Sequence, residues 1–458
     1  MKTTPFQIIL LAVFGASAVI GVLVFAILTS TSKQSTTGPV VIWGTLDDKV
    51  MNQIIQDSAN TNPNLAQVTY VQKDPHTYDE ELIRALASGT GPDLFVFTHD
   101  NAVLDSSEIS LIPYSEITPT QFQNLFIDAA NPLLLPDGIA GLPFLVDPLV
   151  MYWNKDLLST AGLTQPPQYW SQLFTTPMQS LTKRDDSGTI KQSLIALGEY
   201  QNVDHAKDIM STLIMQVGGR ITTRDPSTGE LGAALTQPDP TNVVPGIPAE
   251  TALRFFTEFS DPSKNDYSWN RAQPMASQAF AQGTVALYLG LASEQSAIAS
   301  TNPNLRFAIA RIPQSASGGV TTAHIYALGI SKNSKNIVGA KTVAYTLVSK
   351  VISSLISGGY MMVSPRRDAL ILNSVAGAPT SVDSTVNAAR IAALASATPE
   401  QTVINDSATI SRTWSDPNSQ KTGDMFRAMI EDTTSGGVLL SEAVSRANAQ
   451  LLAIIAGK

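Results

Sequence analysis

The chain has 458 residues, of which 43% are hydrophobic and 15% charged, so it is long enough to form two or three domains with buried cores. Its 38 acidic and 29 basic residues give a net charge of −9 at pH 7. This charge argues against nucleic acid as a partner, because phosphate binding needs clustered lysine and arginine. There is no cysteine, which excludes disulfides, thiolate metal sites and a cysteine nucleophile.

The chain opens with a long apolar run, Ile8–Leu28, that contains no charged residue. The run is about as long as a helix that spans a bilayer, and longer than the roughly 7–15 apolar residues of a cleaved signal peptide. We therefore predict one uncleaved membrane helix within residues 1–30, with a cleaved signal peptide as the alternative. Lys2 favours a cytoplasmic N-terminus, which would leave the rest of the chain outside the cytoplasm. Residues 31–38 are rich in serine and threonine and predict a flexible tether.

Beyond the tether, short apolar strands alternate with amphipathic helices. The strands are predicted at Val40–Trp43, Val68–Val71 and Leu94–Phe97, and this alternation is typical of parallel β-α-β units. In such sheets, ligands bind beyond the carboxyl ends of the strands. We therefore expect binding residues in the loops that follow the first and third strands, residues 44–48 and 98–101.

A second pattern predicts a crossing between two bodies. Two short apolar strands, Leu142–Val146 and Leu149–Trp153, are joined through Asp147-Pro148. Proline fixes its own φ and pushes the preceding residue towards extended geometry, which suits such a crossing. The carboxylate of Asp147 would then lie between the two bodies. Asn154 or Asp156 is the predicted cap of the helix that follows.

Several segments occur in an order that resembles the extracellular solute-binding proteins of ABC importers, in the family of maltodextrin and other sugar binders. The crossing is similar to the G-[IL]-P and Y-[YW]-N-K-D-L segments of that family. The resemblance extends over nearly all of the chain after Gly38. The matching segments are Gly89–Asp93, Gly141–Pro143, Tyr152–Leu158, Pro166–Trp170, Gly283–Gly290, Ala327–Asn336 and Ser364–Ala369.

The resemblance implies an α/β fold of two lobes, of the type II periplasmic-binding-protein class, preceded by the membrane helix. Lobe one would comprise residues 39–146 and 306–347, and lobe two residues 147–305 and 348–458. A solute, with a sugar or oligosaccharide as the first choice, would bind between the lobes and favour their closure. The closed form would be recognised by the permease subunits of an ABC transporter. The resemblance also implies a monomer without a cofactor or enzymatic activity.

The same resemblance supplies candidate ligand-binding residues. Phe97 stands where the family has tryptophan, Asn101 where it has arginine, and the loop Gly290–Ser293 lacks the aromatic residue that stacks on the ligand. Since aromatic faces supply the stacking surface for sugar C–H groups, these departures favour a smaller or less sugar-like solute over a long maltodextrin. The acidic side chains among the candidates favour polyols or cationic solutes over anionic ones. The candidates are Trp43, Thr45, Asp47, Phe97, Asp100, Asn101, Asp147, Trp269, His324, Tyr326, Arg366 and Trp414.

Some of these candidates also have simpler structural explanations. Asp47 lies between a strand and a helix, so it could serve only as the cap of that helix. Trp43 and Phe97 could belong to the core, and Trp269 to surface packing. Arg366 could clamp the return crossing to an acidic side chain instead of contacting a ligand.

The sequence carries no signature of a cofactor or a metal site. It contains no G-x-G-x-x-G, P-loop, H-E-x-x-H or G-x-S-x-G motif, and its four histidines are scattered along the chain. We therefore expect neither a metal nor a cofactor. Two alternatives to transport stay open. One is a carbohydrate-active hydrolase, which needs two carboxylates roughly 5–10 Å apart across the cleft. The other is a surface adhesion or sensory module on the same fold.

Overall fold

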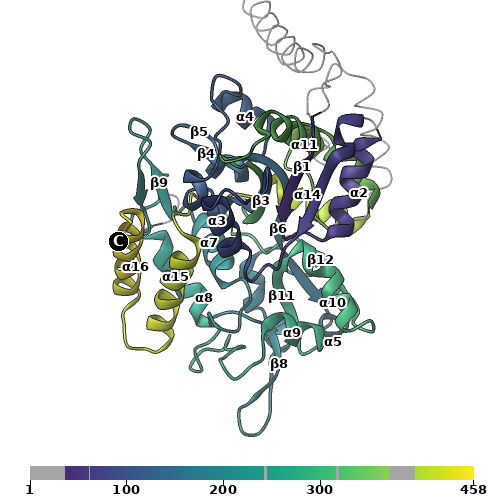
Figure 1. Ribbon diagram of the computed structural model, residues 1–458. Helices are drawn as coiled ribbons and strands as arrows, with labels where there is room; N and C mark the ends of the chain where they lie inside the picture. The colour runs from purple at the N-terminus through teal and green to yellow at the C-terminus, as the bar shows by residue number, and fades with distance from the viewer. Residues whose placement is uncertain are drawn as a thin grey trace, which may run out of the picture.

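The computed structural model describes residues 37–60, 62–241, 245–315, 319–358, 361–370 and 398–457. The predicted membrane helix and most of the predicted tether lie outside these residues. Within the described ranges, no helix is both long and apolar enough to cross a membrane. The residues form two lobes, one above the other in Figure 1, and each lobe has its own hydrophobic core.

One sheet of nine strands runs through both lobes, in the order β2-β1-β3-β13-β6-β11-β8-β7, with β12 also paired to β6. In lobe one, β1 is parallel to β2 and β3, as the alternation of strands and helices predicted. Strand β13 runs antiparallel between β3 and β6. The lobe-one strands are β1 (Val40–Gly44), β2 (Val68–Gln72), β3 (Leu94–Thr98), β13 (Ala323–Ile330) and the first half of β6 (Leu142–Asn154).

The predicted pair of short strands at the crossing is wrong, because β6 is one continuous strand of 13 residues. Its first half, up to Pro148, pairs with β13, and its second half, from Leu149, pairs with β11 and β12. The proline does not interrupt the strand, since its fixed φ and the extended residue before it are both compatible with β geometry. The amide of Leu149 already donates again, to the carbonyl of Thr322 at 3.0 Å. A single continuous strand therefore joins the lobes.

Lobe two contains the remaining strands. One of them, β12, lies in the range 306–347 that the sequence analysis assigns to lobe one. Strand β12 pairs with residues 151–154 of β6, inside the lobe-two half of the sheet. The chain therefore re-enters lobe one at β13 and not at residue 306, because β12 completes the lobe-two core first. The lobe-two strands are β7 (Lys183–Arg184), β8 (Ile190–Ile195), β11 (Val285–Leu291) and β12 (Phe307–Ala310).

A second connection between the lobes lies beside β6. Val363 exchanges two backbone hydrogen bonds with Val146, at 2.8 and 3.0 Å. This contact places the return segment next to Asp147, where the sequence predicted a return crossing. Helix α14 (Pro399–Thr409) also connects the two cores, because Ile404 packs in the lobe-two core and Ala408 in the lobe-one core.

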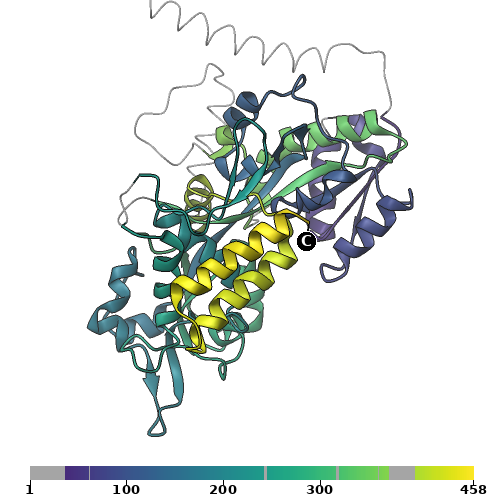
Figure 2. The same cartoon turned by 90° about the vertical axis from the view of Figure 1, so that its left-hand side faces the viewer.

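Amphipathic helices cover the sheet on both lobes. Those of lobe one are α2 (Asp48–Ala59), α3 (Tyr78–Ala87), α4 (Pro119–Leu125) and α11 (Ile337–Gly358). Those of lobe two are α5 (Lys155–Thr160), α7 (Ala206–Gln216), α8 (Pro248–Glu258), α9 (Ala276–Ala281), α10 (Gln295–Thr301), α15 (Ser419–Thr434) and α16 (Leu440–Ile455). Figure 2 shows α15 and α16, in yellow, lying side by side across lobe two. A small hairpin, β9 (Thr222–Arg224) and β10 (Leu231–Ala233), packs beside α16.

Candidate functional site

Polar and charged side chains gather between the lobes, at the point where β6 changes its pairing partners. Lobe one contributes the short helix η2 (His99–Asn101) after β3, and the outward-facing residues of β13. Lobe two contributes the first turn of α7, the short helix η6 (Ala292–Glu294) after β11, and the segment that leads into α15. The carboxyl end of a strand and the beginnings of helices are regular places for ligand-binding groups in α/β folds.

Direct bonds join the two lobes across this site. The hydroxyl of Ser419 donates to Asp100 Oδ2 at 2.5 Å, and His324 Nε2 lies 3.2 Å from Asp208 Oδ2. Directly before β13, the backbone amide of Thr322 donates to the hydroxyl of Thr212 of α7 at 3.1 Å. The lobes are therefore in contact, and the site is enclosed between them.

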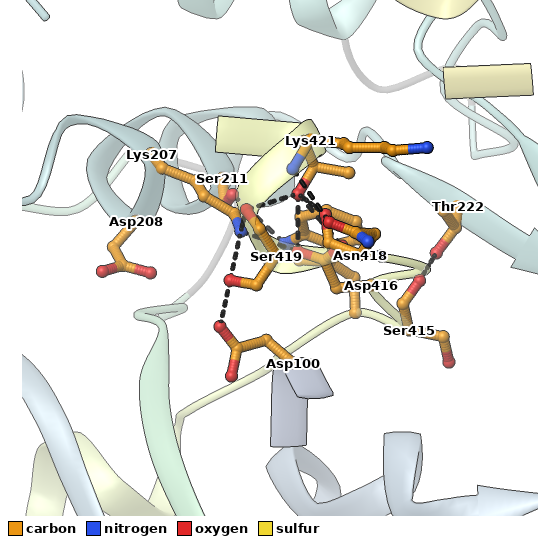
Figure 3. Close-up of polar contacts among 12 residues, drawn as sticks. Asp100, Lys207, Asp208, Ser211, Thr222, Ser415, Asp416, Asn418, Ser419 and Lys421 are labelled. Carbon is orange, nitrogen blue, oxygen red and sulfur yellow. Dashed lines mark hydrogen bonds and ion pairs between the residues drawn. The ribbon is translucent and has the colours of Figure 1, made fainter. Parts of the chain in front are cut away.

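Lys207 is the central cation on the lobe-two side (Figure 3). Its Nζ atom donates to Asp416 Oδ2 at 2.7 Å and to both the carbonyl and the hydroxyl oxygen of Ser419 at 3.1 Å. It also lies 5.5 Å from the centre of the Trp414 ring. Burial by itself lowers the pKa of Lys207, but the neighbouring Asp416 and Asp100 outweigh it and raise the pKa. The ammonium group therefore stays charged and holds Ser419 against Asp100.

A chain of histidines and carboxylates runs from lobe two to lobe one. Tyr288 donates to Glu294 at 2.6 Å, and His205 is bonded to Glu294 through Nε2 and lies 3.6 Å from Asp208 through Nδ1. The same Asp208 oxygen meets His324 of lobe one. Burial works against protonation of both imidazoles, but the carboxylates prevail and raise the pKa of His205 to about 10 and that of His324 to about 9. Both histidines are therefore cations at neutral pH.

His99 differs from these two histidines. It is buried under β13, where its Nδ1 atom accepts the backbone amide of Ile325 at 3.3 Å. Burial lowers its pKa to about 4, so this imidazole is neutral. Its role is to support β13 and the neighbouring His324, whose ring centre is 6.4 Å away.

Two carboxylates in the site keep an oxygen atom without a hydrogen-bond partner. Asp147 is 0% exposed, and its Oδ1 atom accepts the backbone amide of Ser293 at 3.1 Å. Its Oδ2 atom and the Oδ1 atom of Asp100 are both buried, and neither has a partner among the described residues. Burial raises the pKa of Asp147 to about 6. For Asp100, His99 and Lys207 outweigh the effect of burial and lower the pKa below its usual range. A buried acceptor of this kind costs free energy unless a donor reaches it.

Comparison with known proteins places this chain in a family. The sequence profile of the bacterial extracellular solute-binding proteins matches residues 44–350. The chain belongs to that family. Binding proteins of Brucella abortus strain 2308 and Brucella suis biovar 1 are each 25% identical over 276 residues, which are 56% of this chain. The chain spans 58% of the length of these curated relatives.

Solved structures of low sequence identity share the fold of this solute-binding protein. The cyclic α-maltosyl-1,6-maltose-binding protein of Arthrobacter globiformis has a TM-score of 0.70 at 15% identity, covering 92% of this chain and 100% of its own. A cyclo/maltodextrin-binding protein complexed with maltotetraose has a TM-score of 0.66 at 15% identity, covering 92% and 98%. A solute-binding protein of Thermotoga lettingae bound with α-D-tagatose has a TM-score of 0.63 at 18% identity, covering 91% and 100%.

The structure brings five of the predicted site residues of this solute-binding protein together between the lobes. Asp100 and Asp147 contribute the unpartnered oxygens, and His324 reaches across to lobe two. Tyr326 lies on the same face of β13 as His324, and its pKa is raised by burial and by Asp147, Asp100 and Asp208. Trp414 borders the site from lobe two, where its indole donates to Ser211 at 3.2 Å.

Four other predicted residues lie on lobe one, outside this cluster. Asp47 is exposed and caps α2, since its carboxylate accepts the amides of Lys49 and Val50 at 2.9 and 3.2 Å. Trp43 lies under the ammonium group of Lys73, 3.7 Å from its ring centre. Thr45 is half-buried between β1 and α2, and Asn101 is buried and donates to Asp79 at 3.2 Å. Trp43, Thr45 and Asp47, between the end of β1 and the start of α2, form the rim of lobe one, whereas Asn101 belongs to η2, which borders the site.

The side chains of the last three predicted residues make contacts within the protein that stabilise the fold. Phe97 is 4% exposed and packs against Phe95 at a ring distance of 5.7 Å. Trp269 is 0% exposed, and its indole donates to Asn202 at 3.0 Å inside the lobe-two core. The Arg366 guanidinium makes two bonds to Asp368, at 2.9 and 2.8 Å. The two buried rings therefore present no surface to a solute in this conformation.

Sequence reasoning missed most of the lobe-two side of the site. Lys207 and Asp208 belong to the first turn of α7, and no motif marks them as site residues. Glu294 follows the loop Gly290–Ser293, for which the sequence indicated only the missing aromatic residue. Asp416 and Ser419 lie beside Trp414, which was the only hint available. Over the parts of the chain that the structure describes, no group of three or more histidine, aspartate or glutamate side chains is arranged to hold a metal ion.

Proposed function

We propose that this protein captures a small polyhydroxylated solute, a sugar or short oligosaccharide, between its lobes and presents it to the permease of an ABC transporter. One observation carries the proposal. Asp100 and Asp147 each keep a buried, unpartnered carboxylate oxygen at the meeting point of the lobes. Hydroxyl groups of a sugar are donors of the kind that these acceptors require. Two structures of similar fold, one complexed with maltotetraose and one bound with α-D-tagatose, support a sugar as the solute.

The surroundings of the site favour a solute of monosaccharide or disaccharide size. A long maltodextrin needs several aromatic faces for stacking, whereas Phe97 and Trp269 are both buried in cores. Trp414 and Tyr326 are the half-buried aromatic residues next to the cluster. We expect them to flank one sugar ring, while His324 and the two aspartates contact its hydroxyl groups.

Lobe closure is the proposed mechanism of capture. A solute that touches Asp100 on lobe one and the Ser293–Glu294 turn or Trp414 on lobe two binds the closed state better than the open one, and so shifts the equilibrium towards closure. The continuous strand β6 and the Val146–Val363 bridge act as the connections about which the lobes would rotate. Selectivity would follow from hydrogen bonding, since a solute that leaves the buried carboxylates unpaired is rejected.

The proposal also covers the position of the protein in the cell. The apolar run within residues 1–30 would be an uncleaved membrane anchor and residues 31–38 its tether, with the binding lobes of type II topology outside the cytoplasm as a monomer. The described part begins at Thr37, whose carbonyl accepts the side chain of Asn336 at 2.7 Å. The tether would therefore emerge beside the start of α11 on lobe one.

A thermal-shift screen of the full-length protein in mild detergent tests the proposal. The solutes would be neutral sugars, amino sugars, polyols, amino acids and short peptides, because a ligand that binds the folded state raises its apparent stability by mass action. We expect a shift with one or a few small sugars that Asp100→Asn and Tyr326→Ala each abolish. A shift with amino acids or peptides and with no sugar contradicts the proposed solute class.

Glycoside cleavage is a second candidate, because the site holds carboxylates whose surroundings push their pKa values apart. The pKa of Asp147 is raised to about 6, as a general acid requires, while the pKa of Asp100 is lowered, as a nucleophile or stabilising carboxylate requires. Release of nitrophenol from nitrophenyl glycosides, absent in Asp147→Asn, would support this candidate. No release above the buffer rate with a panel of such glycosides would reject it.

A further inference from the structure

The charges between the lobes do not balance. Three cations each have a carboxylate of their own: Lys207 pairs with Asp416, His205 with Glu294 and His324 with Asp208. Asp100 and Asp147 lie in the same cluster, and neither forms an ion pair with a described residue. Among the described residues of this cluster, five carboxylates therefore face three cations that pair with them.

Lys207 and His205 are already committed to other groups, and His324, which lowers the pKa of both remaining carboxylates, is bonded to Asp208 through Nε2. An ammonium group has three N–H donors, and Lys207 uses them on Asp416 and on two oxygens of Ser419. His205 uses both ring nitrogens, one on Glu294 and one on Asp208. Each of these groups would have to break an existing bond in order to neutralise Asp100 or Asp147.

The two unpaired carboxylates lie around one point of the fold. Asp147 is the direct cross-strand partner of His324, and side chains of directly opposite residues stand on the same face of a sheet. Asp100 follows β3, which pairs with β13 on its other side, and it lies close enough for His324 to lower its pKa as well as that of Asp147. Tyr326, two residues further along β13, stands on this face too.

We propose that the solute of this protein is cationic: an amino sugar whose ammonium group lies against the unpartnered oxygens of Asp147 and Asp100. This inference rests on the proposed function and narrows its solute class. A neutral sugar can satisfy the two acceptors but leaves the excess of buried carboxylates over cations in this cluster uncompensated, which is costly. An ammonium group provides both the hydrogen bonds and the charge. An anionic sugar would add a third uncompensated negative charge.

The measurement is isothermal titration calorimetry of the full-length protein in mild detergent near neutral pH. The ligands are D-glucosamine, D-glucose, N-acetyl-D-glucosamine, D-glucuronate and the sugar-free diamine putrescine. We expect glucosamine to bind at least about tenfold more tightly than glucose or the acetylated sugar, and glucuronate not to bind. Asp147→Asn should remove this preference, so that glucosamine and glucose bind within about threefold of each other.

Asp137→Asn is the matched control, because Asp137 is an exposed carboxylate at a turn of lobe one, and it should leave the preference unchanged. Equal affinities of the wild-type protein for glucosamine and glucose would overturn the charge inference while the proposed function stands. Binding of putrescine without any sugar would support the charge inference and overturn the sugar class. A preference for glucosamine that survives in both Asp147→Asn and Asp100→Asn would overturn the assignment of these two residues.

Discussion

Asp47 and Asp100 occupy equivalent places in the sequence pattern but have different surroundings in the structure. Each follows a lobe-one strand at its carboxyl end, where ligands of α/β proteins bind. Asp47 turns back to cap α2 and is exposed. Asp100 points across to Ser419 of lobe two and keeps one buried oxygen unpartnered (Figure 3). The difference shows that position at a strand end is not enough for a carboxylate to face the other lobe. The carboxylate must also be free of the capping bond to the helix that follows it.

Bonds between residues close in sequence and bonds between distant residues also differ in how much they contribute to stability. A cap bond joins residues that are two or three apart and contributes about 1 kcal/mol. The ion pair between Lys207 and Asp416 joins residues 209 positions apart, and breaking one side of a buried pair costs about 3–5 kcal/mol. Four substitutions test this comparison, and they follow from the largest expected effect to the smallest.

Lys207→Met should have the largest effect on stability. It leaves Asp416, which is 1% exposed, without its cation, so we expect the free energy of unfolding to fall by about 3–5 kcal/mol. Urea denaturation monitored by tryptophan fluorescence measures it. Lys421→Met is the control in the same region, since the Lys421 side chain is exposed and should change the free energy by about 0.5 kcal/mol or less. Equal effects of the two substitutions would show that the pair stabilises little.

His324→Gln removes the interlobe ion pair with Asp208. The pKa of His324 is raised to about 9 from 6.5, so its contribution to stability is fully present below pH 6.5 and is lost as the pH rises through 9. The substitution should cost up to about 3 kcal/mol at pH 7 and much less at pH 10, as measured by denaturant unfolding at both pH values. His76→Gln, at an exposed position, is the control and should have little effect at either pH. An unchanged loss at pH 10 would mean that packing, and not charge, is responsible.

Asp147→Asn should stabilise the protein in the absence of solute. The pKa of this carboxyl is raised from 3.8 to about 6, so its burial is harmless when protonated and costs stability as the pH rises from 4 through 6. We expect a gain of up to about 3 kcal/mol above pH 6, and no gain below pH 4. Melting temperatures of both proteins between pH 4 and pH 8 test it. Curves that stay parallel over this range would contradict the assignment of the shift to Asp147.

Asp47→Ala should have the smallest effect, a loss of about 1 kcal/mol from the missing cap of α2. If the contrast with Asp100 holds, Asp47→Ala changes the affinity for the solute by less than about threefold, while Asp100→Asn lowers it strongly. Calorimetric titration of both variants with the solute found in the thermal-shift screen measures this. A loss of binding in Asp47→Ala alone would move the site to the rim of lobe one.

Much of the fold followed from local patterns in the sequence. The three lobe-one strands predicted at residues 40–43, 68–71 and 94–97 are confirmed, because the hydrophobic period depends on neighbours within a few residues. The family segments predicted the two-lobed α/β architecture. The predicted break of β6 at Pro148 was wrong, because the sequence showed the proline but not the strands that pair on either side of it. The assignment of β12 to lobe one failed for the same reason.

The sequence by itself determined the lobes, the crossing and the presence of a carboxylate at Asp147. Only the tertiary structure decided which charges meet. Asp208 contacts His324 over 116 positions of the chain, and Ser419 contacts Asp100 over 319. Pairing of this kind depends on how distant strands and helices are brought together, and it leaves no periodic pattern in the sequence. Burial then set the protonation of each group, because the desolvation and the neighbours that shift a pKa exist only in the folded chain.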